Sequence, residues 1–294
     1  MTVMLLNRRF AKILIFGLLF LIAFVIRIVP VVKNTVNFSF DQGLDIIMVK
    51  QLIVDHKINL ISRYSGLQGV LMGPLWTWFL TLPFIATSGD PAANVAWLSL
   101  LSVASSLATY LIVKKILGET AGFISLVGTL FLPFFIGASQ IVLSPHPLTF
   151  LFIFYIWFLY EIFILDKKRF FLPLGLVVGI FFQFEIAFAI FTLPPIIVLC
   201  LINKKPPTLA SLVLFGLTFI PQIIFDLRHQ FLITKSVINF FTGHNNSLYS
   251  QVPSLFTRFV SRANSFMDDF IDMTISTRNL IILLPITVIS FFGW

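Results

Sequence analysis

Long apolar runs that end in short clusters of lysine and arginine recur along the whole chain. About 20 apolar residues span a bilayer, and several runs reach or approach that length. They are rich in Leu, Ile and Phe without a period of two, and backbone groups in hydrocarbon must be satisfied internally, which favours helices over a barrel. The pattern predicts an all-α, polytopic membrane protein. The basic clusters are Arg8-Arg9-Lys12, Lys114-Lys115, Lys167-Lys168-Arg169 and Lys204-Lys205.

Those clusters predict which side of the membrane each loop occupies, because Lys and Arg favour the cytoplasmic side. The first run, Ala11 to Val32, is longer than the apolar part of a signal peptide, so we interpret it as a retained anchor with a cytoplasmic N-terminus. The block from Pro74 to Thr87 has about 14 residues and two prolines, which suits a helix lying in the interface. If that block crossed, Lys114 and Lys115 would lie outside.

The remaining runs predict seven crossings and the start of an eighth at Leu280. Residues 170–202 have basic clusters at both ends, so we expect a hairpin of two short helices with Glu185 near its outer tip. We expect one transmembrane domain over residues 1–294, with outer loops 33–93 and 226–278. The last run is still open at Trp294, so we expect a fragment of a longer chain. The other predicted crossings are residues 94–113, 120–138, 148–165 and 209–225.

Composition agrees with a membrane protein, since 58% of residues are hydrophobic and the mean hydropathy is +1.01. The net charge of +8 lies in short clusters at helix ends, which indicates a role in topology and no nucleic-acid partner. The single cysteine, Cys200, excludes an intramolecular disulfide framework.

Two carboxylates one helical turn apart distinguish the first outer loop. Residues 38–60 predict an interfacial helix with Asp41 at its start, Asp45 one turn later, and an apolar face formed by Leu44, Ile47, Met48 and Leu52. Such a pair suits a general base with a supporting acid, or ligands for a divalent cation. The alternative is that Asp41 only caps the helix N-terminus.

The order of these elements resembles the GT-C class of membrane glycosyltransferases, and most of all the protein O-mannosyltransferases and aminoarabinose transferases of glycosyltransferase family 39. In that family an Asp-Glu pair precedes the interfacial helix and its Asp is taken as the base; here the pair is Asp41-Gln42. The stretch from Met72 to Phe84 is similar to the family's Gly-Pro and aromatic segment. The family's second outer loop often holds another acid, whereas residues 140–147 hold none.

The resemblance implies a polyprenyl-phosphate sugar as donor, with membrane lipids around its chain. Arg228 and His229 emerge at the outer end of a helix and are candidates for binding the phosphate. A local pair of Arg228 with Asp226, or snorkelling, is the alternative. Gln183 and Glu185 are expected to face the site from the hairpin tip.

His146, between two prolines in the second outer loop, is a further candidate for substrate binding. Arg27 is expected only to reach up from the first helix to the outer headgroups.

The leading hypothesis is therefore an inverting glycosyltransferase in which Asp41 deprotonates a hydroxyl of a lipid, glycan or protein acceptor. A transporter or lipid flippase is the second hypothesis, and it predicts broken helices near the middle of the membrane. A non-catalytic membrane scaffold is the third, favoured by the missing second acid.

Overall fold

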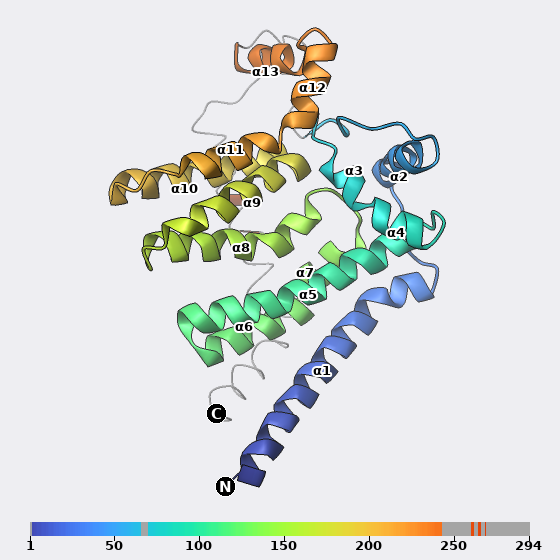
Figure 1. The fold of residues 1–294 in the computed structure, drawn as a ribbon. Helices are drawn as coiled ribbons and strands as arrows, with labels where there is room; N and C mark the ends of the chain where they lie inside the picture. Colours follow the sequence, from blue (N-terminus) through green and yellow to red (C-terminus); the bar gives the residue numbers. More distant parts are fainter. Residues whose placement is uncertain (1, 66–69, 243–259, 262–263, 266–267, 269–294) are drawn as a thin grey trace. The chain divides into compact units, whose positions relative to one another are not determined.

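The computed structural model describes residues 2–65, 70–242, 260–261, 264–265 and 268 (Figure 1). In this part the chain is helical, apart from an isolated bridge between Tyr64 and Leu71, which confirms the all-α prediction for the described residues. The helices are α1 (Thr2–Val32), α2 (Phe40–Ile53), α3 (Leu75–Phe79), α4 (Thr81–Ala86), α5 (Ala92–Leu117), α6 (Glu119–Phe131), α7 (Pro133–Gln140), α8 (His146–Phe163), a 3-10 turn (Lys168–Phe170), α9 (Phe171–Phe184), α10 (Ile186–Asn203), α11 (Leu209–Leu217), α12 (Ile220–Arg228) and α13 (Leu232–Thr242).

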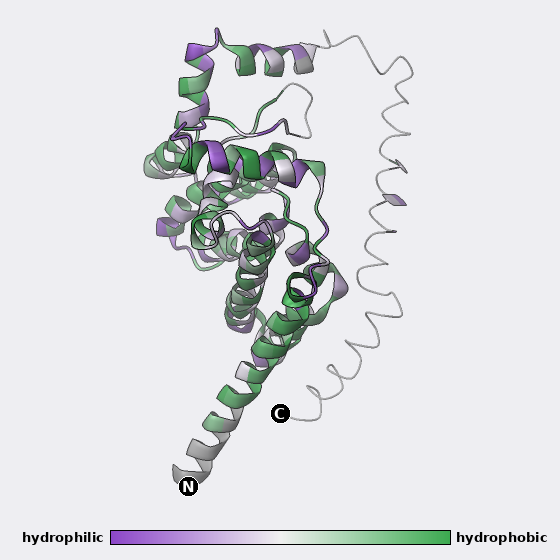
Figure 2. Cartoon of the chain, turned by 90° about the vertical axis from the view of Figure 1, so that its right-hand side faces the viewer, coloured by the Kyte–Doolittle hydropathy of each residue, from purple (hydrophilic) through white to green (hydrophobic). Residues whose placement is uncertain are grey.

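Four of these helices, α1, α5, α8 and α10, are long and apolar enough to cross a membrane. The pairs α6–α7 and α11–α12, bent by 48° and 54°, raise the number of candidate spans in the described residues to six. In Figure 2 the long helix that begins at the N-terminus is predominantly in the hydrophobic colour. This is the architecture of a multi-pass membrane protein. Helices occupy the residues of all seven predicted crossings, but α9 has only 14 residues and is not among the six candidate spans. The count of seven therefore stays a prediction, and the eighth run lies outside the described part.

The described chain separates into two compact units, which we treat one at a time. Unit 1 holds residues 2–37 and 95–142; unit 2 holds residues 38–94 and 143–242, apart from residues 66–69. The prediction of one domain over residues 1–294 stays a prediction.

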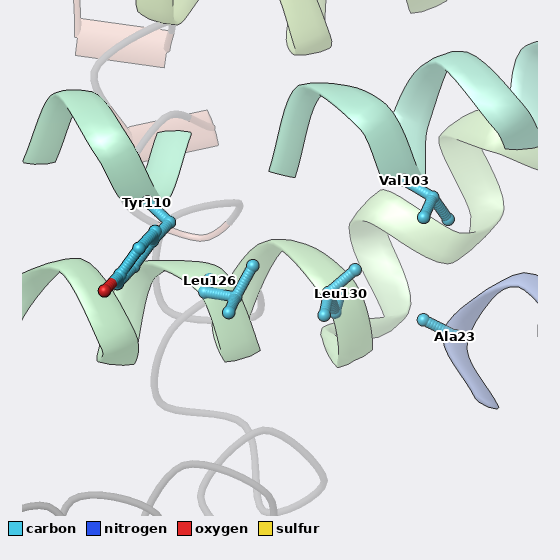
Figure 3. Close-up of a cluster of buried hydrophobic side chains, with 5 residues drawn as sticks. All are labelled: Ala23, Val103, Tyr110, Leu126 and Leu130. Atoms are coloured by element: carbon cyan, nitrogen blue, oxygen red, sulfur yellow. The ribbon is translucent and has the colours of Figure 1, made fainter. Parts of the chain in front are cut away.

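Unit 1 is built from α1, α6, α7 and most of α5 around a small apolar core. Close van der Waals packing of such side chains stabilises the contacts between helices in a membrane. The core residues, drawn in Figure 3, are Ala23 of α1, Val103 and Tyr110 of α5, and Leu126 and Leu130 of α6.

Arg27 is fully buried in unit 1, so the expectation that it reaches the headgroups is wrong. Its guanidinium donates to the carbonyls of Leu130 at 2.6 Å and Thr129 at 3.0 Å, in the last turn of α6. These carbonyls lack helical donors, because a helix end leaves its last carbonyls unpaired and Pro133 has no N–H to offer Thr129. Arg27 also donates to Ser102 of α5 at 3.3 Å, and so ties three helices together.

In unit 2, α8, α10 and α11 all pack on α9. A Cβ on Gly175 would lie 2.4 Å from the Ser211 carbonyl oxygen, and one on Gly179 would lie 2.6 Å from the Thr218 side chain. The two glycines form a Gly-x-x-x-Gly face that allows α11 to approach the α9 backbone closely. The α9–α10 pair breaks at Glu185, as the sequence predicts for the hairpin.

Candidate functional site

The N-terminus of α2 is capped without Asp41. The Ser39 hydroxyl accepts a hydrogen bond from the Gln42 N–H at 3.4 Å, and the Gln42 side-chain oxygen accepts one from the Ser39 N–H at 3.2 Å. This capping box satisfies the orphan donors of the first turn. The alternative in which Asp41 caps the helix is therefore wrong, and Gln42, which stands where the resembled family has its second acid, has a structural role.

The amphipathic character of α2 is inverted relative to that of a helix on a water-soluble protein. It buries Gln42 and Asp45, whereas Phe40 and Ile47 on another face are 80% and 53% exposed. Leu44, from the predicted apolar face, is also exposed. An exposed apolar stripe on a membrane protein suits contact with lipid, which supports the predicted interfacial position of α2.

Arg63 joins the two carboxylates of α2. Its Nη1 lies 3.0 Å from Asp41 Oδ2, and its Nε lies 3.1 Å from Asp45 Oδ1. The Asp41 side chain is 56% exposed, whereas that of Asp45 is 1% exposed. The guanidinium therefore lies between a carboxylate that a substrate can reach and one that it cannot.

Arg63 is not among the site residues predicted from the sequence, although it is the only arginine of the loop 33–93. Short-range pairing of the backbone positions it: Ser62 N–H donates to the Met72 carbonyl and Met72 N–H donates to the Arg63 carbonyl, at 2.8 and 2.9 Å. Its Nη2 also lies 3.5 Å from the hydroxyl of Ser144, which precedes α8. Two segments that the sequence predicts to be outer loops therefore meet at this arginine within unit 2.

Asp45 has a second partner in Trp76 of α3, whose indole N–H donates to Asp45 Oδ2 at 2.8 Å. Burial raises the pKa of Asp45 from its ordinary value of 3.8 to about 6, against the opposing effects of Arg63 and the Trp76 hydrogen bond. The charge of Asp41 raises it further. Asp45 is thus a carboxyl group that changes charge near neutral pH.

The segment from Gly73 to Phe79 connects this cluster to the tip of the α9–α10 pair. The Trp76 ring lies 5.8 Å from the rings of both Phe79 and Phe184. A Cβ on Gly73 would lie 1.7 Å from the Gln183 side-chain oxygen, so a larger residue there would require the Gln183 side chain to move.

Gln183 is buried, and its amide donates to Gln222 Oε1 and to the Thr218 carbonyl, each at 2.8 Å. It therefore lies beside Gly73 and joins the end of α9 to the bend between α11 and α12. Glu185 is half-buried and caps α10, since it accepts a hydrogen bond from the Ala187 N–H at 3.3 Å. Both predicted residues lie at the hairpin tip, in roles that hold the backbone.

The other predicted binding residues lie at the start of α8 and at the end of α12. His146 is half-buried at the start of α8, and Ser144, two residues earlier, lies near Arg63. Arg228 and His229 are exposed at the end of α12. The expected partner of Arg228, Asp226, accepts hydrogen bonds from the backbone of Ile233 and Thr234 instead.

The cluster of Asp41, Asp45 and Arg63 carries a net charge of −1 when both carboxylates are ionised. A divalent cation would have to displace the guanidinium that both carboxylates already face, so the residues present do not fit a resident metal ion. Among the described residues no group of three or more His, Cys, Asp or Glu side chains comes together. The cluster can therefore present one exposed carboxylate, Asp41, to a substrate. Arg63 orients that carboxylate, and the buried Asp45 holds Arg63.

Comparisons with protein-family models, curated proteins and solved structures found no match to this chain.

Proposed function

We propose that this protein transfers a sugar from a polyprenyl-phosphate donor to an acceptor hydroxyl at the outer membrane face, with Asp41 as the general base. The observation that supports this most is the arrangement of two α2 carboxylates on one arginine, one exposed and one buried. The proposal also draws on the resemblance to GT-C glycosyltransferases and on the exposed apolar stripe of α2, which suits a reaction at the lipid interface.

Each member of the cluster has a distinct part in the proposed reaction. Asp41 accepts the proton of the acceptor hydroxyl, whose oxygen bonds to the anomeric carbon as the bond from that carbon to the phosphate oxygen breaks. Arg63 orients Asp41, and Asp45 holds Arg63 from the buried side. A single base on the face opposite the leaving group implies inversion, by analogy with inverting glycosidases.

The departing lipid phosphate needs cations more than it needs an acid, because phosphate is already a good leaving group. Arg228 is the proposed cation, with His229 beside it as a further hydrogen-bonding group, since both are exposed at the end of α12. Arginine suits this part because its planar fork donates two parallel hydrogen bonds to phosphate oxygens.

The bends at α6–α7 and α11–α12 are the observation that favours a transporter, because transporters bind substrates at broken helices. At each bend, a buried side chain of the protein itself binds backbone carbonyls. Arg27 binds the carbonyls of Thr129 and Leu130, and Gln183 binds the carbonyl of Thr218. Glycosyl transfer is therefore the better proposal.

A labelled-donor assay tests it directly. Membranes that contain the full chain are incubated with radiolabelled polyprenyl-phosphate sugars, and release of label from the lipid is measured. Asp41→Asn should reduce release by about 100 to 10,000-fold, the range typical of a general base. Asp55→Asn, on an exposed carboxylate of the same loop, is the matched control and should retain full activity. Asp41→Asn activity within a few-fold of wild type would refute the assignment.

A further inference from the structure

An apolar groove runs between α10 and α11 over the surface of α9, within unit 2. It consists of two adjoining cavities of about 190 and 490 Å³, which share Ile196, Ile197 and Pro207. The floor includes Leu174 and Val178 of α9. The walls are apolar, and the hydroxyl of Ser211, a polar group in the lining, is used in a hydrogen bond to the Thr208 carbonyl at 2.7 Å.

The groove ends at Lys204, which lines the larger cavity. Lys204 is the exposed C-cap of α10, in the left-handed conformation with φ of 51°. No ion-pair partner for it occurs in the described part of the chain. It therefore presents an ammonium group to whatever occupies the groove mouth.

Two neighbouring lysines already form ion pairs, which distinguishes them from Lys204. Lys205 lies 2.8 Å from Asp166, and its hydrogen bond and charge lower the pKa of that carboxyl group. Lys167 lies 2.8 Å from Glu161, whose side chain is fully buried. The nearby acidic groups thus neutralise these two lysines and leave Lys204 available to an external anion.

We propose that this groove binds an anionic glycerophospholipid, with an acyl chain between α10 and α11 and its phosphate on Lys204. An apolar channel on membrane-spanning helices suits a hydrocarbon chain, and basic pockets between such helices select anionic headgroups. Lys168 and Arg169, which closely follow the Asp166 that pairs with Lys205, are also exposed and add positive charge on this side of unit 2. The charge of the mouth thus complements a lipid phosphate.

This lipid site is separate from the proposed active site. The groove follows the first part of α9, from Phe171 to Val178, whereas Phe184 at the end of α9 touches Trp76 of the carboxylate cluster. The 14 residues of α9 span about 21 Å. The inference therefore does not depend on the proposed glycosyl transfer, and its failure would leave that proposal intact.

Native mass spectrometry tests the lipid site on the full chain. The protein is placed in nanodiscs with equal amounts of phosphatidylglycerol and phosphatidylcholine of matched acyl chains, and the retained lipids are counted after release. Wild-type protein should retain phosphatidylglycerol preferentially. Lys204→Gln should weaken that retention about fivefold, the effect of one lysine near a charged lipid, whereas Lys235→Gln on α13 should not.

A second pair of variants tests the groove itself. Ile197→Phe places a larger side chain in the groove and should greatly reduce retention, whereas Val198→Phe, at an adjacent and similarly exposed position outside the lining, should not. Equal retention of the two phospholipids by wild-type protein would overturn the proposal without any variant. Equal effects of the two Phe substitutions, or preferential retention of added polyprenyl phosphate, would also overturn it.

Discussion

Arg27 in unit 1 and Asp45 in unit 2 are both buried charged groups, but they are satisfied in different ways. Arg27 is surrounded by neutral acceptors, chiefly carbonyls at the end of α6, and is fully enclosed. Asp45 faces a cation, Arg63, which also reaches the exposed Asp41. A charge held by backbone carbonyls stabilises a break between helices. A charge held through a partner that extends to the surface can act on a substrate.

The largest effect should come from Arg27→Ala. This change leaves the carbonyls of Thr129 and Leu130 without donors, which we expect to lower the free energy of unfolding by about 3 kcal/mol. Denaturation of the purified protein in detergent measures it, and Arg27→Lys should restore part of the loss. Unchanged stability in the Ala variant would mean that water or another side chain satisfies those carbonyls.

Arg63→Ala, unlike Arg27→Ala, should reduce activity with little loss of stability. Without the guanidinium, Asp45 can take up a proton, while Asp41 loses its orientation; we expect a decrease in sugar release of about 100-fold. Arg63→Lys should fall between the two, because lysine keeps the charge without the fork. The labelled-donor assay measures activity, and a melting curve serves as the control. Full activity in the Ala variant would contradict the proposed orientation of Asp41.

The pH dependence of activity should reveal Asp45. As pH falls through about 6, Asp45 becomes protonated and its attraction for Arg63 weakens, so sugar release should decrease. Asp45→Asn should lower release about tenfold at pH 7.5, a loss of about 1.4 kcal/mol, and should remove this acid limb. The control variant Asp55→Asn should keep the acid limb. If the limb near pH 6 also persisted in Asp45→Asn, it would belong to another group.

The raised pKa of Asp45 predicts the opposite pH dependence for the free energy of unfolding. Because the folded-state pKa of Asp45 lies above its ordinary 3.8, its contribution to stability is fully present below pH 3.8 and is lost as pH rises through about 6. Above that pH, Asp45→Asn should therefore not destabilise the protein, in contrast to Arg27→Ala. Unfolding measured at pH 4 and pH 7.5 in both proteins checks the sign.

The smallest effect should come from Trp76→Phe, which removes one N–H donor and keeps a ring beside Phe184. That hydrogen bond lowers the pKa of Asp45, so its loss should move the acid limb to higher pH. We expect the limb to move up by roughly 0.7 in pH, equivalent to about 1 kcal/mol, with little change in activity at pH 7.5. Trp78→Phe, on the same short helix, is the control. A limb at the same pH in both variants would mean that the hydrogen bond has no effect on Asp45.

The sequence by itself determines the helical segments of the described part of this protein and the break at Glu185. These features follow from local composition: apolar runs must be helical in lipid, and a lone charge in an apolar run marks an end or a turn. The positions of Asp41 and Asp45 one turn apart are likewise a local property of the helix.

Only the tertiary structure decided the partners of the charged groups. Arg27 meets carbonyls more than 100 residues away, and nothing near Arg27 in the sequence indicates that the end of α6 and Pro133 leave them unpaired. Arg63 reaches α2 because residues 62–65 pair with residues 70–72, a contact that no periodicity encodes. Ser39, and not Asp41, caps α2, because several residues near a helix start can supply a cap and only the backbone geometry selects one.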